Sequence, residues 1–256
     1  MKISIIIPAY NEEKRIGKTL YSYSSFFKKI KNVNTEILVV INNTKDNTLK
    51  IVKEFRKKNK KINYLNLKEG GKGYAVMKGF SKVLESKPDL IGFVDADMST
   101  SPEAFYDLVK NLGNYQGIIA SRYISGASVS PRPTISRIIV SRIYNSLIRA
   151  LFLMSFKDTQ CGAKLFKLEA IKSIINKMGM TQWAFDIELL YLLRNQGFKV
   201  KEFPSVWSDK EYSTINFMKA GPWMALAVIR LRILNSPFKS FIRIYDKLIS
   251  VAPFPR

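Results

Sequence analysis

The chain of 256 residues has no histidine and only one cysteine, Cys161. Without histidine, the sequence excludes Ser-His-Asp triads, histidine general bases and histidine metal ligands. A single cysteine forms neither an intrachain disulfide nor a cysteine-rich zinc site, which is typical of a reducing compartment. No stretch reaches about 18 uninterrupted apolar residues, so a membrane span is not expected. The apolar run at residues 3–7 is too short for a signal peptide.

Acidic residues are scarce as well. The chain has 20 Asp and Glu against 42 Lys and Arg, a formal net charge of +22. Such an excess of positive charge favours polyanionic partners, which include nucleic acid, an anionic membrane surface and phosphorylated substrates. Residues 108–157 and 212–245 contain no acidic residue at all. These two segments are therefore the expected contacts with an anionic surface.

The first acid-free segment contains a helical pattern. At 100° per residue one arc is polar and the opposite arc is apolar, the polar arc being formed by Arg137, Ser141, Arg142, Asn145 and Arg149. This pattern predicts either a basic helix on an anionic surface or an ordinary helix with its apolar face in the core. The lack of acidic residues favours the anionic surface.

The second acid-free segment contains an apolar run at residues 220–229, which arginines follow at once. The run is too short to span a bilayer comfortably. It fits an interfacial helix with Trp223 near the headgroups and the arginine side chains snorkelling. A dimerisation helix in a homo-oligomer is the alternative. We therefore expect a catalytic domain at residues 1–215 and a basic amphipathic extension at residues 216–256.

Short apolar runs alternate with helical patterns along the first half of the chain. The expected strands are residues 3–7, 36–41, 62–67, 90–94 and 117–120, and the expected helices are residues 12–29, 46–60, 73–85 and 103–112. Strands separated by helices predict right-handed βαβ units. The fold class is therefore α/β, with a Rossmann-like, mostly parallel sheet flanked by helices.

Two carboxylates, Asp95 and Asp97, follow the apolar run at residues 90–94 directly. In open α/β sheets, ligands bind outside the carboxyl ends of the strands. Magnesium and manganese prefer a few carboxylate oxygens and complete their coordination with water and substrate phosphates. The pair therefore predicts a site for a metal-bridged diphosphate, although surface turns also contain aspartates.

The first turn, residues 8–13, lacks the Gly-x-Gly-x-x-Gly pattern of dinucleotide-binding enzymes. Residues 70–73 read Gly-Gly-Lys-Gly and lack the Walker spacing. These glycines still begin an expected helix beside Lys72, where backbone N–H groups and a cation can face phosphate. The alternative is a flexible turn with a solvated lysine.

Six segments form an ordered set along the chain: residues 5–13, 71–73, 95–97, 121–123, 158–162 and 183–188. Together they resemble the family 2 glycosyltransferases of the GT-A fold, and within that family the branch of the dolichyl-phosphate glucosyltransferases and dolichol-phosphate mannose synthases. The resemblance implies transfer of one hexose, with inversion, from UDP-glucose or GDP-mannose to a polyprenyl (dolichyl) phosphate. It also implies Mg²⁺ or Mn²⁺ as cofactor and a peripheral position on the cytoplasmic face of a membrane.

The resemblance also assigns roles on the side of the nucleotide sugar. Lys72 would approach the diphosphate, and Asp95 would hold ribose or sugar hydroxyls. The base and ribose would lie among Pro8, Tyr10, Asn11 and Glu12. The family usually has Asp-Asp-Gly-Ser-x-Asp after its second strand, whereas residues 41–46 here read Ile-Asn-Asn-Thr-Lys-Asp. Asn42 both donates and accepts, unlike a carboxylate, so the choice between uridine and guanosine stays open.

The metal and acceptor roles follow in the same way. Asp97 would be the principal metal ligand, with Asp95 and Ser99 beside it. The acceptor phosphate would be bound by Arg122, Arg137 and Ser141. Fixed cations would stabilise the charge that gathers on the leaving diphosphate.

The acceptor itself reduces the need for a general base. A phosphate monoester has a second pKa near ~6, so near neutrality it already carries an anionic nucleophilic oxygen. Asp158 could still orient the nucleophile or take a proton, and a structural turn residue is the alternative. Asp186 and Glu188 are further candidates, although positions i and i+2 of a helix do not share a face.

Two other functions compete with this hypothesis. Polysaccharide-polymerising relatives carry Gln-x-x-Arg-Trp, which none of the three tryptophans matches. A nucleic-acid-binding module is favoured by charge alone and would show interleaved aromatics. It leaves the ordered motifs unexplained, so no nucleic-acid partner is expected.

Overall fold

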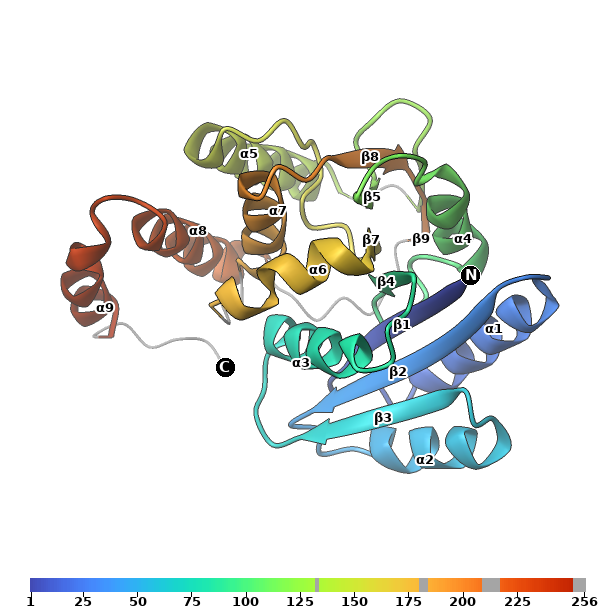
Figure 1. Cartoon of the computed structure of the whole chain (residues 1–256). Coiled ribbons are helices and arrows are strands. Elements are labelled where there is room, and N and C mark those ends of the chain that lie inside the picture. The colour runs from blue at the N-terminus through green and yellow to red at the C-terminus, as the bar shows by residue number, and fades with distance from the viewer. Residues whose placement is uncertain (132–133, 180–183, 209–216, 251–256) are drawn as a thin grey trace.

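The computed structural model describes residues 1–131, 134–179, 184–208 and 217–250. Its centre is a seven-stranded sheet in the order β3-β2-β1-β4-β7-β5-β8 (Figure 1). The strands are β1 Lys2–Ala9, β2 Asn34–Asn42, β3 Ile62–Leu67, β4 Leu90–Phe93, β5 Gly117–Ser121, β7 Lys164–Lys167 and β8 Val200–Pro204. A second sheet pairs β6 (Ser128–Ser130) with β9 (Val206–Ser208).

Helices cover both faces of the sheet. Their bounds are α1 Ile16–Lys29, α2 Thr48–Lys58, α3 Lys72–Leu84, α4 Pro102–Asn111, α5 Ile135–Phe152, α6 Leu168–Ile174, α7 Phe185–Asn195, α8 Phe217–Leu234 and α9 Ile242–Ser250. Short 3-10 turns lie at Ile175–Lys177 and Lys239–Phe241. The predicted α/β class is therefore confirmed.

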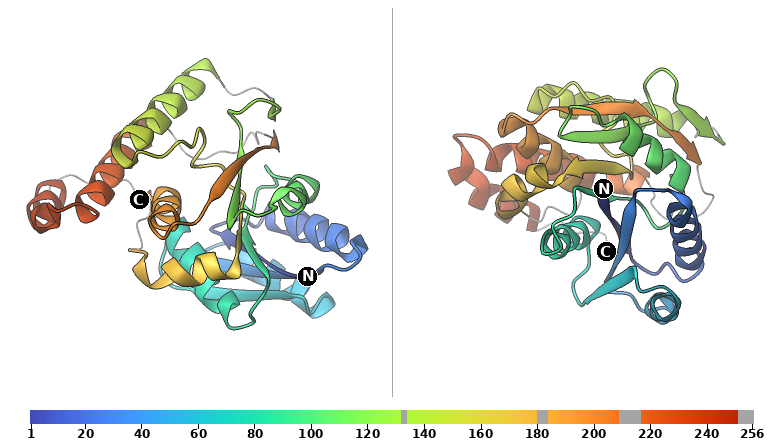
Figure 2. Two further views of the ribbon diagram at one scale, coloured as in Figure 1. Left: turned by 45° about the horizontal axis from the view of Figure 1, so that its top comes forward. Right: turned by 45° about the vertical axis from the view of Figure 1, so that its right-hand side comes forward.

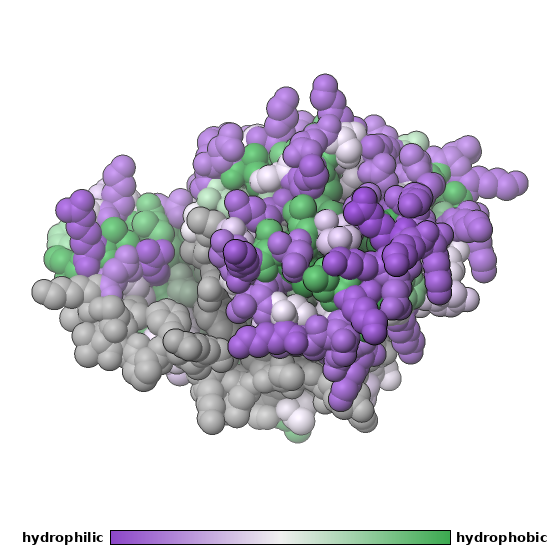
Figure 3. All heavy atoms as spheres, turned by 90° about the horizontal axis from the view of Figure 1, so that it is seen from below, coloured by the Kyte–Doolittle hydropathy of each residue, from purple (hydrophilic) through white to green (hydrophobic). Residues whose placement is uncertain are grey.

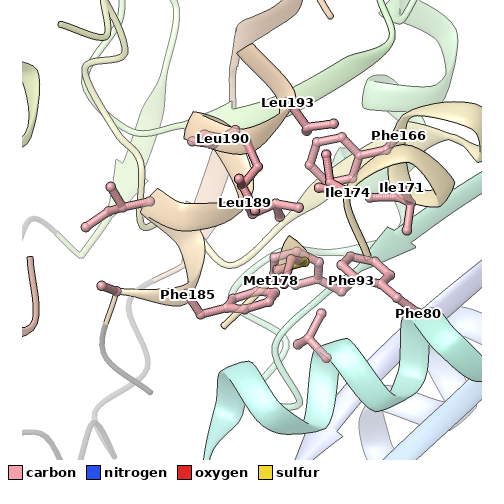
Figure 4. Close-up of a cluster of buried hydrophobic side chains, with 14 of the residues drawn as sticks. Phe80, Phe93, Phe166, Ile171, Ile174, Met178, Phe185, Leu189, Leu190 and Leu193 are labelled. Atoms are coloured by element: carbon pink, nitrogen blue, oxygen red, sulfur yellow. The ribbon is translucent and has the colours of Figure 1, made fainter. Parts of the chain in front are cut away.

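The alternation of β1 explains why two cores form. Successive side chains of a strand point to opposite faces. Ile3, Ile5 and Ile7 join one buried cluster with residues of α1, α2 and α4, whereas Ile6 joins the other cluster with residues of α3, α6 and α7. Figure 4 shows this second cluster, in which aromatic rings of β4, β7 and α3 meet the leucines of α7.

The sheet is mostly parallel, as predicted, but not entirely. β1, β2, β3 and β4 pair in parallel, and β5 pairs in parallel with β8. Between these groups β7 runs antiparallel to both β4 and β5. The four residues of β7 are buried or half-buried and give no alternating pattern, so the sequence did not predict this strand.

The first helix begins later than predicted, at Ile16 rather than Glu12. The Glu12 carbonyl accepts hydrogen bonds from the N–H groups of Arg15 and Ile16, and the Glu12 carboxylate binds the Arg15 guanidinium. Asn11 has φ 53°, in the left-handed region, so the backbone changes direction sharply two residues after β1 ends. Residues 12–15 therefore form a turn, and the apolar periodicity begins only after it.

The first basic helix, α5, is exposed on parts of both predicted arcs. Of the apolar side chains, Ile139 and Ile143 are 52% and 65% exposed, and Ile135 before them is 76% exposed. Of the polar arc, Arg142 and Arg149 are exposed, whereas Asn145 is buried. The Asn145 side-chain oxygen accepts hydrogen bonds from the N–H and hydroxyl of Thr159, at 3.2 Å and 3.1 Å, which fixes this one position of the polar arc inside the protein.

Helix α8 packs beside α5, as both views of Figure 2 show. Met224, Val228 and Leu231 of α8 are buried in the same cluster as Phe185. In the part of the chain that the structure describes, no helix is long and apolar enough to cross a membrane. The underside of the molecule carries mostly hydrophilic side chains (Figure 3). The division at residue 215 stays a prediction, and residues 209–216 lie outside the described ranges.

Candidate functional site

The residues predicted to bind the nucleotide sugar and the metal meet at the carboxyl ends of β1, β2 and β4, where α/β sheets bind ligands. Pro8 lies within β1 and Asn42 is the last residue of β2, while Asp95 follows β4 after one residue. Lys72 is the first residue of α3. Because these strands are neighbours in the sheet, segments far apart in the sequence form one edge.

Asn42 joins two of these segments. Its side-chain amide donates to the Ala9 carbonyl at 2.9 Å, and its side-chain oxygen accepts from the Gly71 N–H at 3.1 Å. Asn42 is also buried. A carboxylate cannot donate, so it could not make both bonds. The departure from the family pattern thus has a structural role, which fixes the glycine turn before Lys72 to the end of β1.

The turn after β1 is fixed by the loop after β2. The N–H of Asn11 donates to Thr44 Oγ1 at 3.3 Å, and the N–H of Glu12 donates to Thr48 Oγ1 at 2.8 Å. The Asn11 side-chain oxygen accepts from the Lys45 N–H at 2.9 Å. Tyr10 is 53% exposed beside this turn. The backbone of residues 10–12 is therefore held, and the Tyr10 ring is free to contact a planar ligand.

Lys72 and Asp95 form an ion pair with 2.5 Å between Nζ and Oδ1. Burial raises the pKa of Asp95, the Lys72 ammonium opposes this rise, and the charge of Asp97 adds to it. Gly162 makes the close approach possible, because a Cβ at that position would lie 1.9 Å from Asp95 Oδ2. The position of Asp95 thus depends on a glycine 67 residues later in the chain.

Asp97 and Ser99 form a tight turn after β4. The Ser99 N–H donates to Asp97 Oδ1 at 2.8 Å, and Met98 between them has φ 62°. The Ser99 hydroxyl is buried and has no hydrogen-bond partner among the described residues. This hydroxyl can therefore take part in hydrogen bonding or coordination of a ligand at the turn.

Oxygen donors of this kind fit Mg²⁺ or Mn²⁺. Such ions commonly use one or two protein carboxylates and take their remaining ligands from water and substrate phosphates. Asp97 and Asp95 supply two carboxylates, and the unpartnered Ser99 hydroxyl lies in the same turn. In the described ranges, no group of three or more metal-binding side chains of His, Cys, Asp or Glu occurs. A metal here would therefore depend on the substrate for further ligands.

Glu12 faces the same negative region. Burial raises the pKa of Glu12, its two hydrogen bonds with Arg15 oppose this rise, and the charges of Asp97 and Asp95 add to it. Three carboxylates therefore share a neighbourhood in which Arg15 and Lys72 supply positive charge. A divalent cation would be attracted to this region.

Arg122 and Asp158 form a second polar centre. Arg122 donates to the Asp158 carboxylate from its backbone N–H at 3.0 Å, from Nε at 2.7 Å and from Nη2 at 3.0 Å. The guanidinium lies 5.1 Å from the Trp207 ring centroid and 5.3 Å from that of Tyr123. Burial opposes ionisation of Asp158, but Arg122 outweighs it and lowers the pKa of the carboxyl. Asp158 therefore holds Arg122 in place, and a direct chemical role for Asp158 stays a prediction.

The two centres are connected through β9. Trp207 pairs with Thr100, and the Ser208 N–H donates to the Ser99 carbonyl at 2.9 Å. Trp207, which stacks with Arg122, is thus fixed directly beside the turn that contains Asp97. The strand that packs on Arg122 is thus joined to the turn that contains Asp97.

The remaining acceptor residues are only partly described. The Tyr123 hydroxyl donates to Ser141 Oγ at 2.9 Å, which links Ser141 of α5 to the segment of Arg122. Arg137 belongs to α5, but its side chain lies outside the described residues. Glu188, a candidate base, is buried and accepts from the Gly179 N–H at 2.8 Å. Each of these roles stays a prediction.

Sequence reasoning assigned no role to Lys164, Gly162 or Trp207. Lys164 is fully buried and pairs with Asp186, with 2.7 Å between Nζ and Oδ1. Cys161, buried beside it, contributes a carbonyl oxygen to the same ammonium at 2.7 Å. A lysine between Ala163 and Leu165, in an otherwise apolar run, is the one sequence signal that could have indicated a buried charge.

The comparisons with known proteins agree with this geometry. The family model described as "Glycosyl transferase family 2" matches residues 4–175 of this chain. A dolichyl-phosphate beta-glucosyltransferase of Trichomonas vaginalis is 33% identical over 218 residues, which cover 80% of this chain and 64% of that protein. The chain thus spans about two thirds of that relative's length. A dolichyl-phosphate beta-glucosyltransferase of Dictyostelium discoideum is 30% identical over 90% of this chain and 73% of its own.

A solved structure shows the fold as well. Glucosyl-3-phosphoglycerate synthase from Mycobacterium tuberculosis, in complex with Mn²⁺, UDP and phosphoglyceric acid, superposes with a TM-score of 0.66 and 17% identity. The superposition covers 91% of this chain and 77% of that one. The predicted GT-A fold is confirmed by this likeness. Because the family model matches residues 4–175 and the relatives above are 30% identical or more, the chain belongs to glycosyl transferase family 2.

Proposed function

We propose that this protein transfers one hexose from a nucleotide sugar to a polyprenyl phosphate, with inversion at the anomeric carbon. The observation that carries the proposal is the Asp95–Asp97 turn, with Lys72 paired to Asp95 at the carboxyl end of β4. The names of the relatives, dolichyl-phosphate beta-glucosyltransferases, support the lipid phosphate acceptor and favour glucose as the hexose.

On the donor side, the chain would bind the nucleotide between the first turn and the loop after β2. The exposed Tyr10 ring is available to the base, and Lys72 can leave Asp95 to contact the diphosphate. Mg²⁺ or Mn²⁺, held by Asp97 and Asp95 with Ser99 nearby, would neutralise charge on the leaving diphosphate when bound. We assign Asn42 a structural role in this binding site, because it is buried and joins Ala9 to Gly71.

On the acceptor side, Arg122 would bind the lipid phosphate, together with Ser141 and Arg137. The phosphate oxygen attacks the anomeric carbon from the face opposite the diphosphate, and the bond to the diphosphate breaks. This oxygen is anionic near neutrality, so the reaction needs no histidine base. Arg122 is suited to the role because Asp158, Tyr123 and Trp207 fix its guanidinium.

The acceptor also requires a membrane surface. Ile135, Ile139 and Ile143 lie four residues apart on α5 and are more than half exposed, and Arg142 and Arg149 are exposed on the same helix. Apolar side chains with cations around them bind the interface of an anionic bilayer. The protein would thus act as a peripheral enzyme, with the assignment to the cytoplasmic face still a prediction.

The experiment is a transfer assay with lipid extraction. Purified protein is incubated with Mg²⁺, a short polyprenyl phosphate and either labelled UDP-glucose or labelled GDP-mannose, and the label in the organic phase is counted. We expect label from one donor, lost with EDTA and restored by Mg²⁺ or Mn²⁺. NMR of the product then gives the anomeric configuration. Folded protein that moves no label from either donor with either metal would contradict the proposal.

A further inference from the structure

Three consecutive backbone N–H groups in the connection between α5 and β7 donate to side chains of two other elements. The N–H groups of Lys157 and Asp158 donate to the two carboxylate oxygens of Glu202 in β8, each at 2.9 Å. The N–H of Thr159 donates to the side-chain oxygen of Asn145 in α5 at 3.2 Å, and the Thr159 hydroxyl donates to the same oxygen at 3.1 Å. These three residues are therefore attached to β8 on one side and to α5 on the other.

The 157–159 segment needs such bonds because it belongs to no helix or strand. Its backbone therefore lacks the hydrogen bonds of regular secondary structure, although Asp158 and Thr159 are both fully buried. Backbone N–H groups that are buried need an acceptor. The side chains of Glu202 and Asn145 supply these acceptors, and in doing so they fix the course of the segment.

The side chain of Asp158 connects this segment to Arg122. Both carboxylate oxygens of Asp158 accept from the Arg122 guanidinium, at 2.7 Å and 3.0 Å, and one of them also accepts from the Arg122 N–H at 3.0 Å. Arg122 directly follows β5, and Glu202 is paired in register with Ile119 of that strand. Glu202 thus fixes Asp158 relative to the strand from which Arg122 extends.

Helix α5 is also bonded to the residue after Arg122. The Tyr123 hydroxyl donates to Ser141 Oγ at 2.9 Å. Asn145, one turn further along α5, donates through its amide to the Ser141 carbonyl at 3.0 Å. The hydrogen bonds therefore form a closed circuit, which runs from Arg122 through α5 and the 157–159 segment and back to Arg122. A change at Asn145 would reach the guanidinium through this circuit without touching it.

We propose that Asn145 and Glu202 are positioning residues of the acceptor site, which align the Arg122 guanidinium for the acceptor phosphate through the 157–159 segment. The inference rests on the proposed function, since it concerns the phosphate that Arg122 would bind. Asn145 is buried, and Glu202 uses both carboxylate oxygens within the protein, so each acts through other residues and not on the substrate. An arginine binds a phosphate through two parallel hydrogen bonds only when its guanidinium is held in the correct geometry.

The test separates the acceptor from the donor. Initial rates of transfer by the full chain, from the nucleotide sugar that serves the wild type to a short polyprenyl phosphate, give a KM for each substrate. Asn145→Leu removes the oxygen that Thr159 uses, and we expect it to raise the acceptor KM about tenfold and to keep the donor KM within about twofold. Glu202→Gln keeps one of the two acceptor oxygens and should raise the acceptor KM about threefold.

Matched variants control for the loss of packing. Thr159→Val removes one hydroxyl and should raise the acceptor KM, whereas Thr159→Ser keeps the hydroxyl and should restore the wild-type value. This pair decides the question if Asn145→Leu does not fold by circular dichroism. Asn111 of α4 donates to the Asp107 carbonyl at 2.8 Å, the same bond within a helix that Asn145 makes. Asn111→Leu should therefore leave both KM values unchanged.

The outcomes distinguish this proposal from the proposed function. Wild-type protein that transfers hexose, with variants that lower the thermal midpoint but leave the acceptor KM unchanged or raise both KM values equally, would overturn only the positioning role. If the wild type transfers no hexose, the proposed function fails, and calorimetry with the short polyprenyl phosphate compares the variants instead. Weaker binding by Asn145→Leu would then keep the positioning role. Binding equal to that of the wild type, or no binding by either protein, would overturn it.

Discussion

The N-terminal half of the molecule, residues 1–112, and the C-terminal half, residues 113–250, fix their polar groups in different ways. In the N-terminal half, backbone N–H groups donate to short side chains, as Glu12 does to Thr48, and ion pairs such as Lys72–Asp95 are partly exposed. In the C-terminal half, the described ion pairs include two with a fully buried partner, Arg122–Asp158 and Lys164–Asp186. Neutral bonds of the first kind cost little when lost, whereas a broken buried pair leaves a charge without a partner.

Because of this difference, we expect substitutions in the two halves to affect activity and stability differently. A substitution in the N-terminal site should reduce the reaction and leave the fold almost unchanged. A substitution in the C-terminal site should affect both, because the groups that face the acceptor also hold the loops together. The following variants test the contrast, beginning with the largest expected effect.

Asp97→Asn should reduce transfer by about three orders of magnitude, since a metal-stabilised leaving group accounts for several kcal/mol. Its thermal midpoint should stay within a few degrees of the wild-type value. Asp107→Asn, on the exposed face of α4, is the matched control and should keep full activity. Transfer by Asp97→Asn at the wild-type rate, with unchanged metal dependence, would remove Asp97 from the metal site.

Asp158→Asn should lower the free energy of unfolding by about 3 kcal/mol at neutral pH, because Arg122 is left buried without its counterion. Urea unfolding measures this loss. Asp246→Asn breaks an exposed pair with Arg230 and should cost under about 1 kcal/mol. Equal losses in the two variants would contradict the contrast between buried and exposed pairs.

The same pair predicts a pH dependence. The folded-state pKa of Asp158 lies below the ordinary value of 3.8, so the unfolded chain binds more protons in that range. The stabilisation is therefore complete above pH 3.8 and is lost as the pH falls through the folded-state pKa. Wild-type protein should lose more stability on acidification than Asp158→Asn, and acid titrations followed by circular dichroism can compare them. Parallel curves would contradict the assignment.

Gly162→Ala should reduce transfer by about 100-fold, since a Cβ 1.9 Å from Asp95 Oδ2 displaces that carboxylate. This variant tests whether a residue of the C-terminal half sets the position of Asp95 in the N-terminal site. Gly221→Ala, whose Cβ would meet nothing within 4 Å, is the control. Wild-type kinetics for Gly162→Ala would show that Asp95 does not need its present position.

Ile139→Glu should weaken binding to vesicles with anionic lipids by about tenfold, since it replaces an exposed apolar side chain, proposed to enter the bilayer interface, by a negative charge. Sedimentation with sucrose-loaded vesicles measures the affinity. Tyr21→Glu alters a residue of α1 that is 67% exposed and should have little effect. If both variants bind as the wild type does, α5 does not contact the membrane.

The sequence predicted the N-terminal half better than the C-terminal half, for physical reasons. Parallel strands between helices give short, uninterrupted apolar runs, and Asp95 and Asp97 follow such a run directly, so strand and site were both recognisable. The short strand β7 has no pattern of its own, and Lys164 reads as a surface residue until β4 and β5 are placed on either side of it. The periodicity of α5 was recognisable, but the burial of Asn145 depends on its hydrogen bonds with Thr159, which lies beyond the helix.

The solitary cysteine has a practical consequence. Cys161 is 1% exposed, and burial, reinforced by Asp158, raises the pKa of its thiol to about 11. Since the thiolate is the reactive form, this thiol should resist alkylation and air oxidation in the folded protein. An introduced cysteine would then be the single labelling position of the whole chain. A fluorophore placed at Ile139→Cys could report how deep α5 enters a bilayer, with no background from the native sequence.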